Sequence, residues 1–191
     1  MTFHELDNKL KISFVSLRGS IIAGSFGGVL FGINFTLQLL VGMFRLTGAS
    51  GFLTGLTVPF FLAIASRMNR QWGTATIIWT LYSFLAIPTE LMGVPGPYKL
   101  LVGFMGGLAY DVGYCGLKCK PFALYIALIL YVVMLSLGFY VVFITGLVQD
   151  IVGGSILKIL TIVPLVFIIE GMLSTFAASR FMKKYSRLFG L

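Results

Sequence analysis

Two carboxylates stand inside long apolar stretches of this sequence, where a charged side chain is costly and is by default a functional candidate. Glu170 lies in LVFIIEGML, well inside an apolar run, and Asp111 lies near the end of GPYKLLVGFMGGLAYDVGY. A carboxyl at the depth of Glu170 could bind a cationic or amine-bearing ligand, relay protons, or stay neutral and fix helix packing. Asp111 is about two turns from Lys118, so a structural or coupling role is favoured for it over substrate contact.

Aromatic rings and a few polar groups gather near one set of segment ends. Trp79, Tyr82 and Tyr98 lie there, and polar side chains lie in or beside the same links: Arg45, Glu90, Lys99, Gln149, Asp150 and Lys158. Trp and Tyr at such positions usually anchor a protein at the membrane interface. Flat apolar walls with a few polar groups are also what a small-molecule pocket needs. Asn34 and Gln38, one helical turn apart, share a face and need partners.

Several chemistries are set aside by what the sequence lacks. It contains no HExxH pair, no GxxxxGK[ST] loop and no GxSxG elbow, so we expect no enzyme and no cofactor. The single histidine, His4, disfavours a metal site. Cys115 and Cys119 are interpreted as two small apolar residues. No nucleotide-binding module is present, so active transport would need a partner that hydrolyses ATP.

The composition predicts a membrane protein. Of the 191 residues, 58% are hydrophobic and 10% are charged, whereas a soluble domain carries about 25% charged residues. A spanning helix needs about 20 mostly apolar residues. Turn-rich, charged or proline-rich links divide the chain into six such segments, at about 18–42, 51–66, 73–91, 97–116, 121–148 and 154–181. We therefore expect an all-α fold, a polytopic membrane protein with six transmembrane helices in one bundle.

The basic residues predict the orientation, because short cytoplasmic loops are enriched in Lys and Arg. One set of links and ends holds eleven of the 14 basic residues: Lys9, Lys11, Arg18, Arg67, Arg70, Lys118, Lys120, Arg180, Lys183, Lys184 and Arg187. Both termini are therefore expected in the cytoplasm, with residues 1–191 forming one integral domain in the cell membrane. Residues 1–17 are interpreted as an amphipathic cytoplasmic segment. The net charge of +8 is interpreted as a signal of topology. The basic residues are scattered over short loops, which disfavours nucleic-acid binding.

Small residues line the first and fourth segments. The first holds Ala23, Gly24, Gly27, Gly28 and Gly32, and the fourth holds Gly103, Gly106 and Gly107. Small residues let helices approach closely in lipid. The first-segment set could pack inside this protein or dock onto a separate membrane subunit.

The chain resembles the substrate-binding S components of energy-coupling factor (ECF) transporters. The resemblance rests on size, six segments, Arg18 leading into the small-residue face at Ala23 and Gly27, and a proline-rich outer loop before a glycine-rich fourth segment with an acid near its inner end. Glycines stand in the first segment where alanines are commoner in that family. The resemblance implies uptake of a vitamin or vitamin precursor, with docking on a transmembrane coupling subunit that carries two ABC ATPases.

The resemblance also implies where the ligand binds. The loop around 45–52 would act as a lid, and segments four to six with their outer loops would line the pocket. The residues expected to bind substrate are Glu90, Tyr98, Lys99, Asp150 and Glu170, with Trp79 and Tyr82 stacking on a ring. A channel or secondary carrier, and a membrane scaffold subunit without a ligand, remain open as alternatives.

Overall fold

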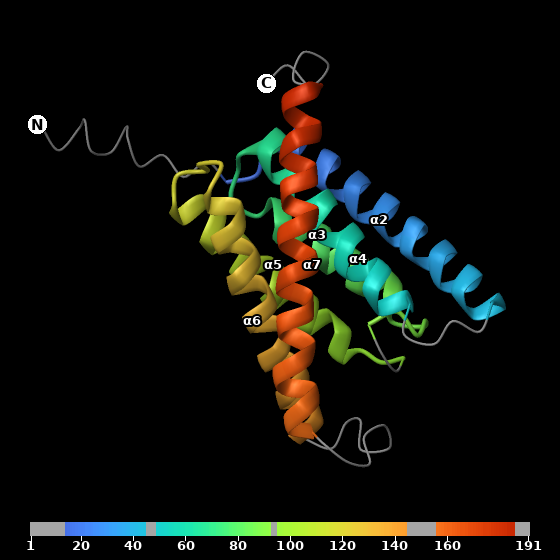
Figure 1. Cartoon of the computed structure of the whole chain (residues 1–191). Helices are drawn as coiled ribbons and strands as arrows, with labels where there is room; N and C mark the ends of the chain where they lie inside the picture. Colours follow the sequence, from blue (N-terminus) through green and yellow to red (C-terminus); the bar gives the residue numbers. More distant parts are fainter. Residues whose placement is uncertain (1–13, 45–48, 93–94, 145–155, 186–191) are drawn as a thin grey trace, which may run out of the picture.

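The computed structural model describes residues 14–44, 49–92, 95–144 and 156–185 (Figure 1). Six helices fill nearly all of this part of the chain: α2 (Leu17–Met43), α3 (Ala49–Asn69), α4 (Thr74–Ala86), α5 (Tyr98–Gly116), α6 (Ala123–Ile144) and α7 (Ile156–Lys184). Each helix overlaps one of the six predicted segments. Apart from a single bridge between Phe14 and Trp72, the described residues form no β-structure. The prediction of an all-α fold is confirmed.

The helices pack side by side in a closed order that differs from their order along the chain. Going round the bundle, α2 contacts α3, α3 contacts α7, α7 contacts α6, α6 contacts α5, α5 contacts α4, and α4 contacts α2. A further contact between α3 and α4 crosses the interior of this ring. The helices α3 and α7 are the neighbours that lie farthest apart in the sequence. They form an interface of their own, away from the pair formed by α4 and α5 (Figure 1).

Four of the helices are long and apolar enough to cross a membrane, over Leu17–Met43, Phe52–Asn69, Ala123–Val141 and Pro164–Lys184. These segments indicate a membrane-embedded protein. The helix α4 has only 13 residues, which corresponds to about 20 Å and is shorter than a hydrocarbon core of about 30 Å. Six complete spans therefore remain a prediction for α4 and α5.

The helix α4 begins near residue 73, where the third predicted segment begins, but ends five residues before that segment does. Pro88 has no amide hydrogen, and the carbonyl of Phe84 instead accepts from the Ile87 amide at 3.3 Å. The described residues from Ile87 to Pro97 then form turns, with Met92 at a φ of 61°. The proline-rich link thus interrupts the helices as its composition predicts.

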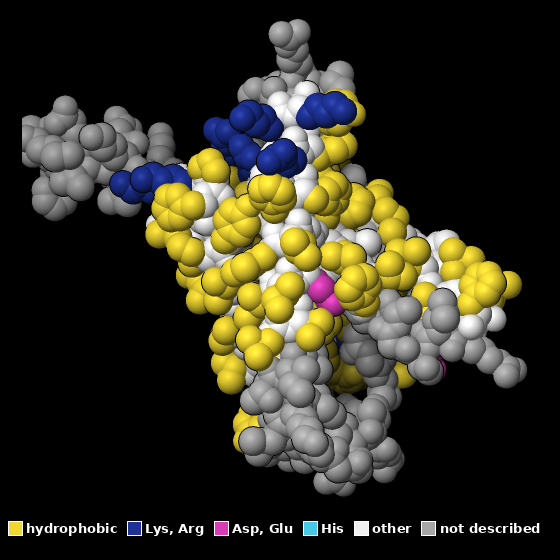
Figure 2. Space-filling model, viewed as in Figure 1, with side chains coloured by type: hydrophobic (Ala, Val, Ile, Leu, Met, Phe, Trp, Pro, Cys, Tyr) yellow, Lys and Arg dark blue, Asp and Glu magenta, His cyan; other side chains and the backbone are white. Residues whose placement is uncertain are grey.

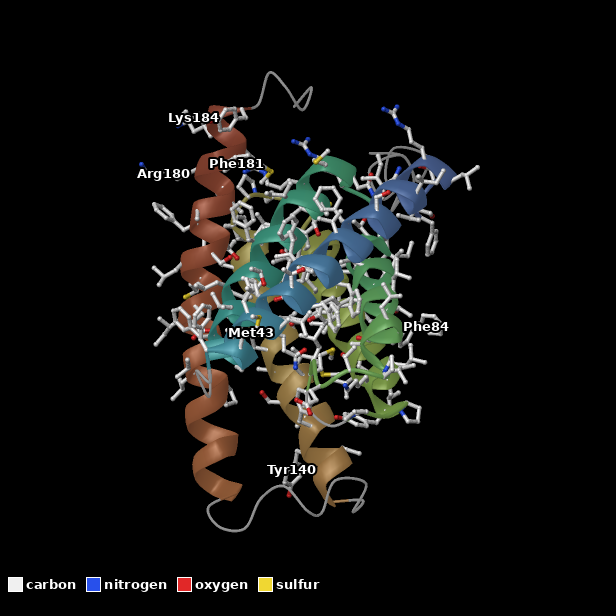
Figure 3. All side chains as sticks on the ribbon, turned by 90° about the vertical axis from the view of Figure 1, so that its right-hand side faces the viewer. Met43, Phe84, Tyr140, Arg180, Phe181 and Lys184 are labelled. Atoms are coloured by element: carbon white, nitrogen blue, oxygen red, sulfur yellow. The ribbon has the colours of Figure 1, made fainter. Side chains whose placement is uncertain are left out.

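The helices α4 and α5 contribute many of the buried residues in the interior of the bundle. Seven residues of α4 and nine of α5 are buried, including Trp79, Tyr82, Tyr110 and Tyr114. The helices around them expose large apolar side chains, and these cover the side of the bundle as a continuous hydrophobic surface (Figure 2). Phe84, which is 57% exposed, is the outward-facing residue of α4 (Figure 3).

Basic side chains gather at one end of the bundle (Figure 2). Arg180 and Lys184 mark this end of α7, and Tyr140 lies near the opposite end (Figure 3). Three contacts join the links at the basic end: Val15 N to Trp72 O at 3.1 Å, Asn69 Nδ2 to Gly19 O at 2.9 Å, and Cys119 Sγ to Arg70 O at 3.8 Å. Cys115 and Cys119 are both free, with their sulfurs 3.7 Å apart.

The closest helix approach gives a stability prediction. A Cβ at Gly107 of α5 would lie 2.6 Å from Thr76 Cα and 2.8 Å from Ala75 O in α4, whereas a Cβ at Gly116 would meet nothing within 4 Å. Gly107→Ala should lower the free energy of unfolding by about 1–3 kcal/mol through overpacking. Gly116→Ala, on the same helix, is the matched control and should leave stability nearly unchanged. Thermal unfolding in detergent measures both, and equal melting temperatures would contradict this close α4–α5 packing.

Candidate functional site

The α4–α5 pair is held at one end by a carboxylate. Asp111 of α5 is fully buried. Its Oδ1 accepts from the Ala75 amide at 3.0 Å, and its Oδ2 accepts from the Thr76 amide at 2.8 Å and the Thr76 hydroxyl at 2.7 Å. These amides belong to the first turn of α4, whose N–H groups have no partner within the helix. Asp111 is therefore a helix cap supplied by a neighbouring helix, and no ion pair with a base is needed to explain its burial.

The same pair is held at its other end by a cation. Lys99, in the first turn of α5, is fully buried. Its Nζ donates to the carbonyl oxygens of Ala86 at 3.0 Å and Thr89 at 2.6 Å, where α4 ends. Glu90 lies close enough to interact electrostatically with this ammonium. A cation at a helix C-terminus and an anion at its N-terminus both complement the helix dipole.

Glycines between the two charged residues let the helices meet at backbone distance. A Cβ at Gly103 would overlap the Ser83 side chain and lie 2.9 Å from Trp79 O. With Gly107 against Thr76, these glycines form the α4-facing side of α5. On another side of α5, a Cβ at Gly113 would lie 2.6 Å from Ala127 Cα of α6. The glycine-rich sequence of this segment therefore serves packing against two helices at once.

A buried aromatic cluster, formed by Trp79, Tyr82, Tyr110 and Tyr131, occupies the space between α4, α5 and α6. The Trp79 ring stacks on Tyr131 with centroids 5.4 Å apart and meets Tyr82 edge-on at 5.0 Å, and Tyr110 meets Tyr131 at 6.4 Å. Trp79 is 2% exposed, and Tyr82 and Tyr110 are 0% exposed. Burial of this degree rules out the interpretation of Trp79 and Tyr82 as interfacial anchors.

Three polar atoms of this aromatic cluster have no hydrogen-bond partner within the described part of the chain. They are the indole N–H of Trp79 and the hydroxyls of Tyr82 and Tyr110. A buried donor that lacks an acceptor costs about 1–3 kcal/mol, and most buried side-chain polar atoms in proteins do find a partner. The aromatic cluster thus combines flat apolar surfaces with unmet polar groups, two features that ligand sites also have.

The other predicted substrate residues lie in two different places. Tyr98 and Lys99 begin α5 at the Ile87–Pro97 turn, where the Tyr98 hydroxyl donates to Met92 O at 3.3 Å, and Glu90 is exposed in this turn. Glu170 of α7 is 5% exposed and faces Gly55 of α3. Asp150, and residues 45–48 of the expected lid, lie outside the described residues. The structure therefore groups Trp79 with Tyr82 and Tyr98 with Lys99, and it places Glu170 in a separate helix pair.

Sequence reasoning missed Tyr110 and Tyr131 as members of the aromatic cluster. The sequence did contain a signal, because Tyr131 lies in the middle of a strongly apolar helix and Tyr110 directly precedes Asp111. A hydroxyl at such a depth needs a partner just as a buried amide does. Asn34, by contrast, was recognised, and it finds its partner within the protein: its Oδ1 accepts from the Thr57 hydroxyl of α3 at 2.9 Å.

The predicted docking residues of α2 divide between two faces. Ala23 is fully buried, and a Cβ at Gly27 would lie 3.0 Å from Ile78 O, so these two residues pack against α4. Gly24 lies at the edge of this contact, because a Cβ at Gly24 would lie 4.0 Å from its nearest neighbour, Leu81 Cδ2. A Cβ at Gly28 or Gly32 would meet nothing within 4 Å. One part of the set therefore serves internal packing, and the other part faces outward.

Comparison of the chain with protein families, with curated proteins and with solved structures finds no match.

The capping role of Asp111 can be tested by an isosteric change. Asp111→Asn keeps the shape but replaces one acceptor oxygen with a donor amide, which leaves first-turn donors of α4 without an acceptor. We expect a loss of about 1.5–3 kcal/mol in the free energy of unfolding, as for a hydrogen bond to a charged group. Val112→Leu, at an exposed position beside Asp111, is the control and should change stability by less than about 0.5 kcal/mol. Thermal or denaturant unfolding in detergent measures both, and a variant as stable as the parent would contradict the cap.

Proposed function

We propose that this protein is the membrane-embedded substrate-binding subunit of an ECF-type uptake transporter for a vitamin or vitamin precursor. The observation that carries the proposal is the aromatic cluster, with the unpartnered polar atoms of Trp79, Tyr82 and Tyr110. A heterocyclic ligand would stack on the rings and accept hydrogen bonds from these donors. Unlike the polar groups of Asp111 and Lys99, which are engaged in capping α4, these groups are free for such a role.

The proposed orientation places the basic end of the bundle in the cytoplasm, in accordance with the enrichment of Lys and Arg in cytoplasmic loops. Both chain ends then lie on the cytoplasmic side of the cell membrane. The opposite end, with the Ile87–Pro97 turn and Lys99, faces outward, and the ligand enters from there. Tyr98, Lys99 and Glu90 line this approach, and Trp79 and Tyr82 contact the ring of the bound ligand.

The outward-facing glycines of α2 support docking on a second membrane subunit. Nothing in the described structure covers Gly28 or Gly32, and small residues on a lipid-facing helix allow a partner helix to approach closely. The partner in this proposal is a coupling subunit that carries two ABC ATPases, since the chain itself has no nucleotide-binding motif. A secondary carrier is less well supported, because Asp111, one of the two intramembrane acids that could serve a polar path, is engaged in capping α4.

The proposed function is tested by isolating the tagged protein from native membranes in mild detergent, with mass spectrometry of proteins and small molecules. We expect two ABC ATPases, a helical coupling subunit and a bound heterocycle. Gly28→Leu with Gly32→Leu should abolish recovery of the coupling subunit, whereas Val29→Leu, on an exposed neighbour, should not. Recovery of the protein alone from the parent sample would overturn the transporter assignment and favour a carrier or a scaffold.

The aromatic cluster can be tested without knowing the ligand. Tyr82→Phe and Tyr110→Phe each remove a buried hydroxyl that has no partner, so the ligand-free protein should be as stable as the parent or more stable. Tyr140→Phe, at a 41% exposed position, is the control. A clear drop in melting temperature for Tyr82→Phe or Tyr110→Phe would show that the hydroxyl has a structural partner and would remove the argument for a ligand.

Binding itself can be followed from inside the aromatic cluster. The chain has two tryptophans, so Trp72→Phe leaves Trp79 as the only indole fluorophore. Cationic heterocycles of the thiamine type and carboxylated vitamins should be titrated against this variant in nanodiscs. We expect one class to shift the Trp79 emission, and Tyr82→Phe should weaken that ligand about tenfold, which corresponds to one hydrogen bond of about 1.4 kcal/mol. Unchanged affinity in Tyr82→Phe would exclude this hydroxyl from the site.

A further inference from the structure

The interface between α3 and α7 holds a carboxyl group that has no charged partner among the described residues. Glu170 of α7 is 5% exposed, and a Cβ at Gly55 would overlap its carboxylate oxygen. The carboxyl therefore rests on the backbone of α3, in the space that the missing side chain of Gly55 leaves. Within the described residues it has no hydrogen-bond or ion-pair partner. Acidic side-chain atoms reach the surface over α7 in the middle of the hydrophobic face (Figure 2), and Glu170 is the only acidic residue of α7.

No cation in the described part of the chain is placed to pair with this carboxyl. The helix α6 has no charged residue, and α3 has only Arg67. Arg67 follows Gly55 by about 18 Å along α3, and Arg180 follows Glu170 by about 15 Å along α7, at a rise of 1.5 Å per residue. Lys158 lies a similar distance away in the other direction, and its side chain is outside the described residues. An isolated carboxylate at this depth is costly, so a cation supplied by a ligand would favour the charged form of Glu170.

An apolar groove continues from this carboxyl along the same two helices. Its volume is about 370 Å³, and its walls are Leu56, Thr57, Phe60 and Phe61 of α3 with Leu173, Ser174 and Ala177 of α7. Ser174 is one turn after Glu170, and Leu56 directly follows Gly55, so the carboxyl stands at one end of the groove. The polar groups of the walls are already engaged, because the Ser174 hydroxyl donates to Leu56 O and the Thr57 hydroxyl donates to Asn34 Oδ1.

We propose that the α3–α7 groove is a binding site for a lipophilic amine or ammonium ion, with Glu170 as its counter-ion. The cationic head pairs with the Glu170 carboxylate, and the apolar body lies along Phe60, Phe61 and Leu173. Because the groove lies on the hydrophobic face of the bundle, such a ligand enters from the bilayer. The site is separate from the aromatic cluster, which is built by α4, α5 and α6, and the proposal does not depend on a coupling subunit.

The experiment compares two probes that differ only in charge, 1-adamantanamine and the neutral 1-adamantanol, by equilibrium binding to the full chain in nanodiscs. The parent protein should bind the amine at least tenfold more tightly than the alcohol. Glu170→Gln keeps the shape of the side chain and should abolish this preference without weakening the alcohol. Ile169→Val, at an exposed position of α7 that is not part of the groove walls, should leave both affinities unchanged. The melting temperature of each variant establishes that it is folded.

A second variant tests the groove independently of the charge. Ala177→Phe places a ring where the body of the ligand would lie, so it should weaken both probes. Equal affinity of the parent for amine and alcohol, or retention of the amine preference in Glu170→Gln, would overturn the proposal. This assay uses the purified protein alone, whereas the uptake function is tested by the partners recovered from native membranes. Failure of one proposal can therefore be distinguished from failure of the other.

Discussion

The antiparallel α4–α5 pair depends on one electrostatic arrangement: α5 supplies an acid to the amide end of α4 and a base to its carbonyl end. Asp111 and Lys99 are twelve residues apart on α5, which corresponds to about 18 Å, and α4 is about 20 Å long. The two charged side chains therefore reach the two ends of one short helix. In the interior of a membrane protein there is no water to solvate these helix ends. The spacing of the two charges on α5 must therefore match the length of α4.

This arrangement explains why α4 and α5 bury one face against each other. Other helices cover the remaining sides of this pair: α2 and α3 contact α4, and α6 contacts α5. Gly103 and Gly107 are needed because the caps form only if the helix backbones come within van der Waals distance. Gly113 performs the same function towards α6, and Gly27 performs it between α2 and α4.

The positions of the six helices could be predicted from the sequence because their apolar length and their breakers are local properties. The roles of single polar residues could not, because they depend on which helices become neighbours. Asp111 and Lys99 were recognised as unusual, but the sequence does not reveal that both address α4. Trp79 and Tyr82 were taken as surface anchors or pocket walls, and the ring-shaped helix order places them in the interior beside Tyr131. The same order places Glu170 opposite Gly55, more than 100 residues away in the chain.

The buried polar groups of this protein fall into two sets: those that have a hydrogen-bond partner within the described residues and those that do not. Asp111, Lys99, Asn34 and Ser174 all lie at membrane depth or are deeply buried, and each has a partner that fixes a helix to its neighbour. The donors of the aromatic cluster and the carboxyl of Glu170 have none within the described residues, yet each stands beside apolar or aromatic surface. Polar groups that stabilised only the fold would be expected to be paired, because an unpaired one opposes folding in lipid. Each of these groups leaves a hydrogen-bond or ion-pair requirement that the described part of the protein does not meet, and both binding proposals rest on that feature.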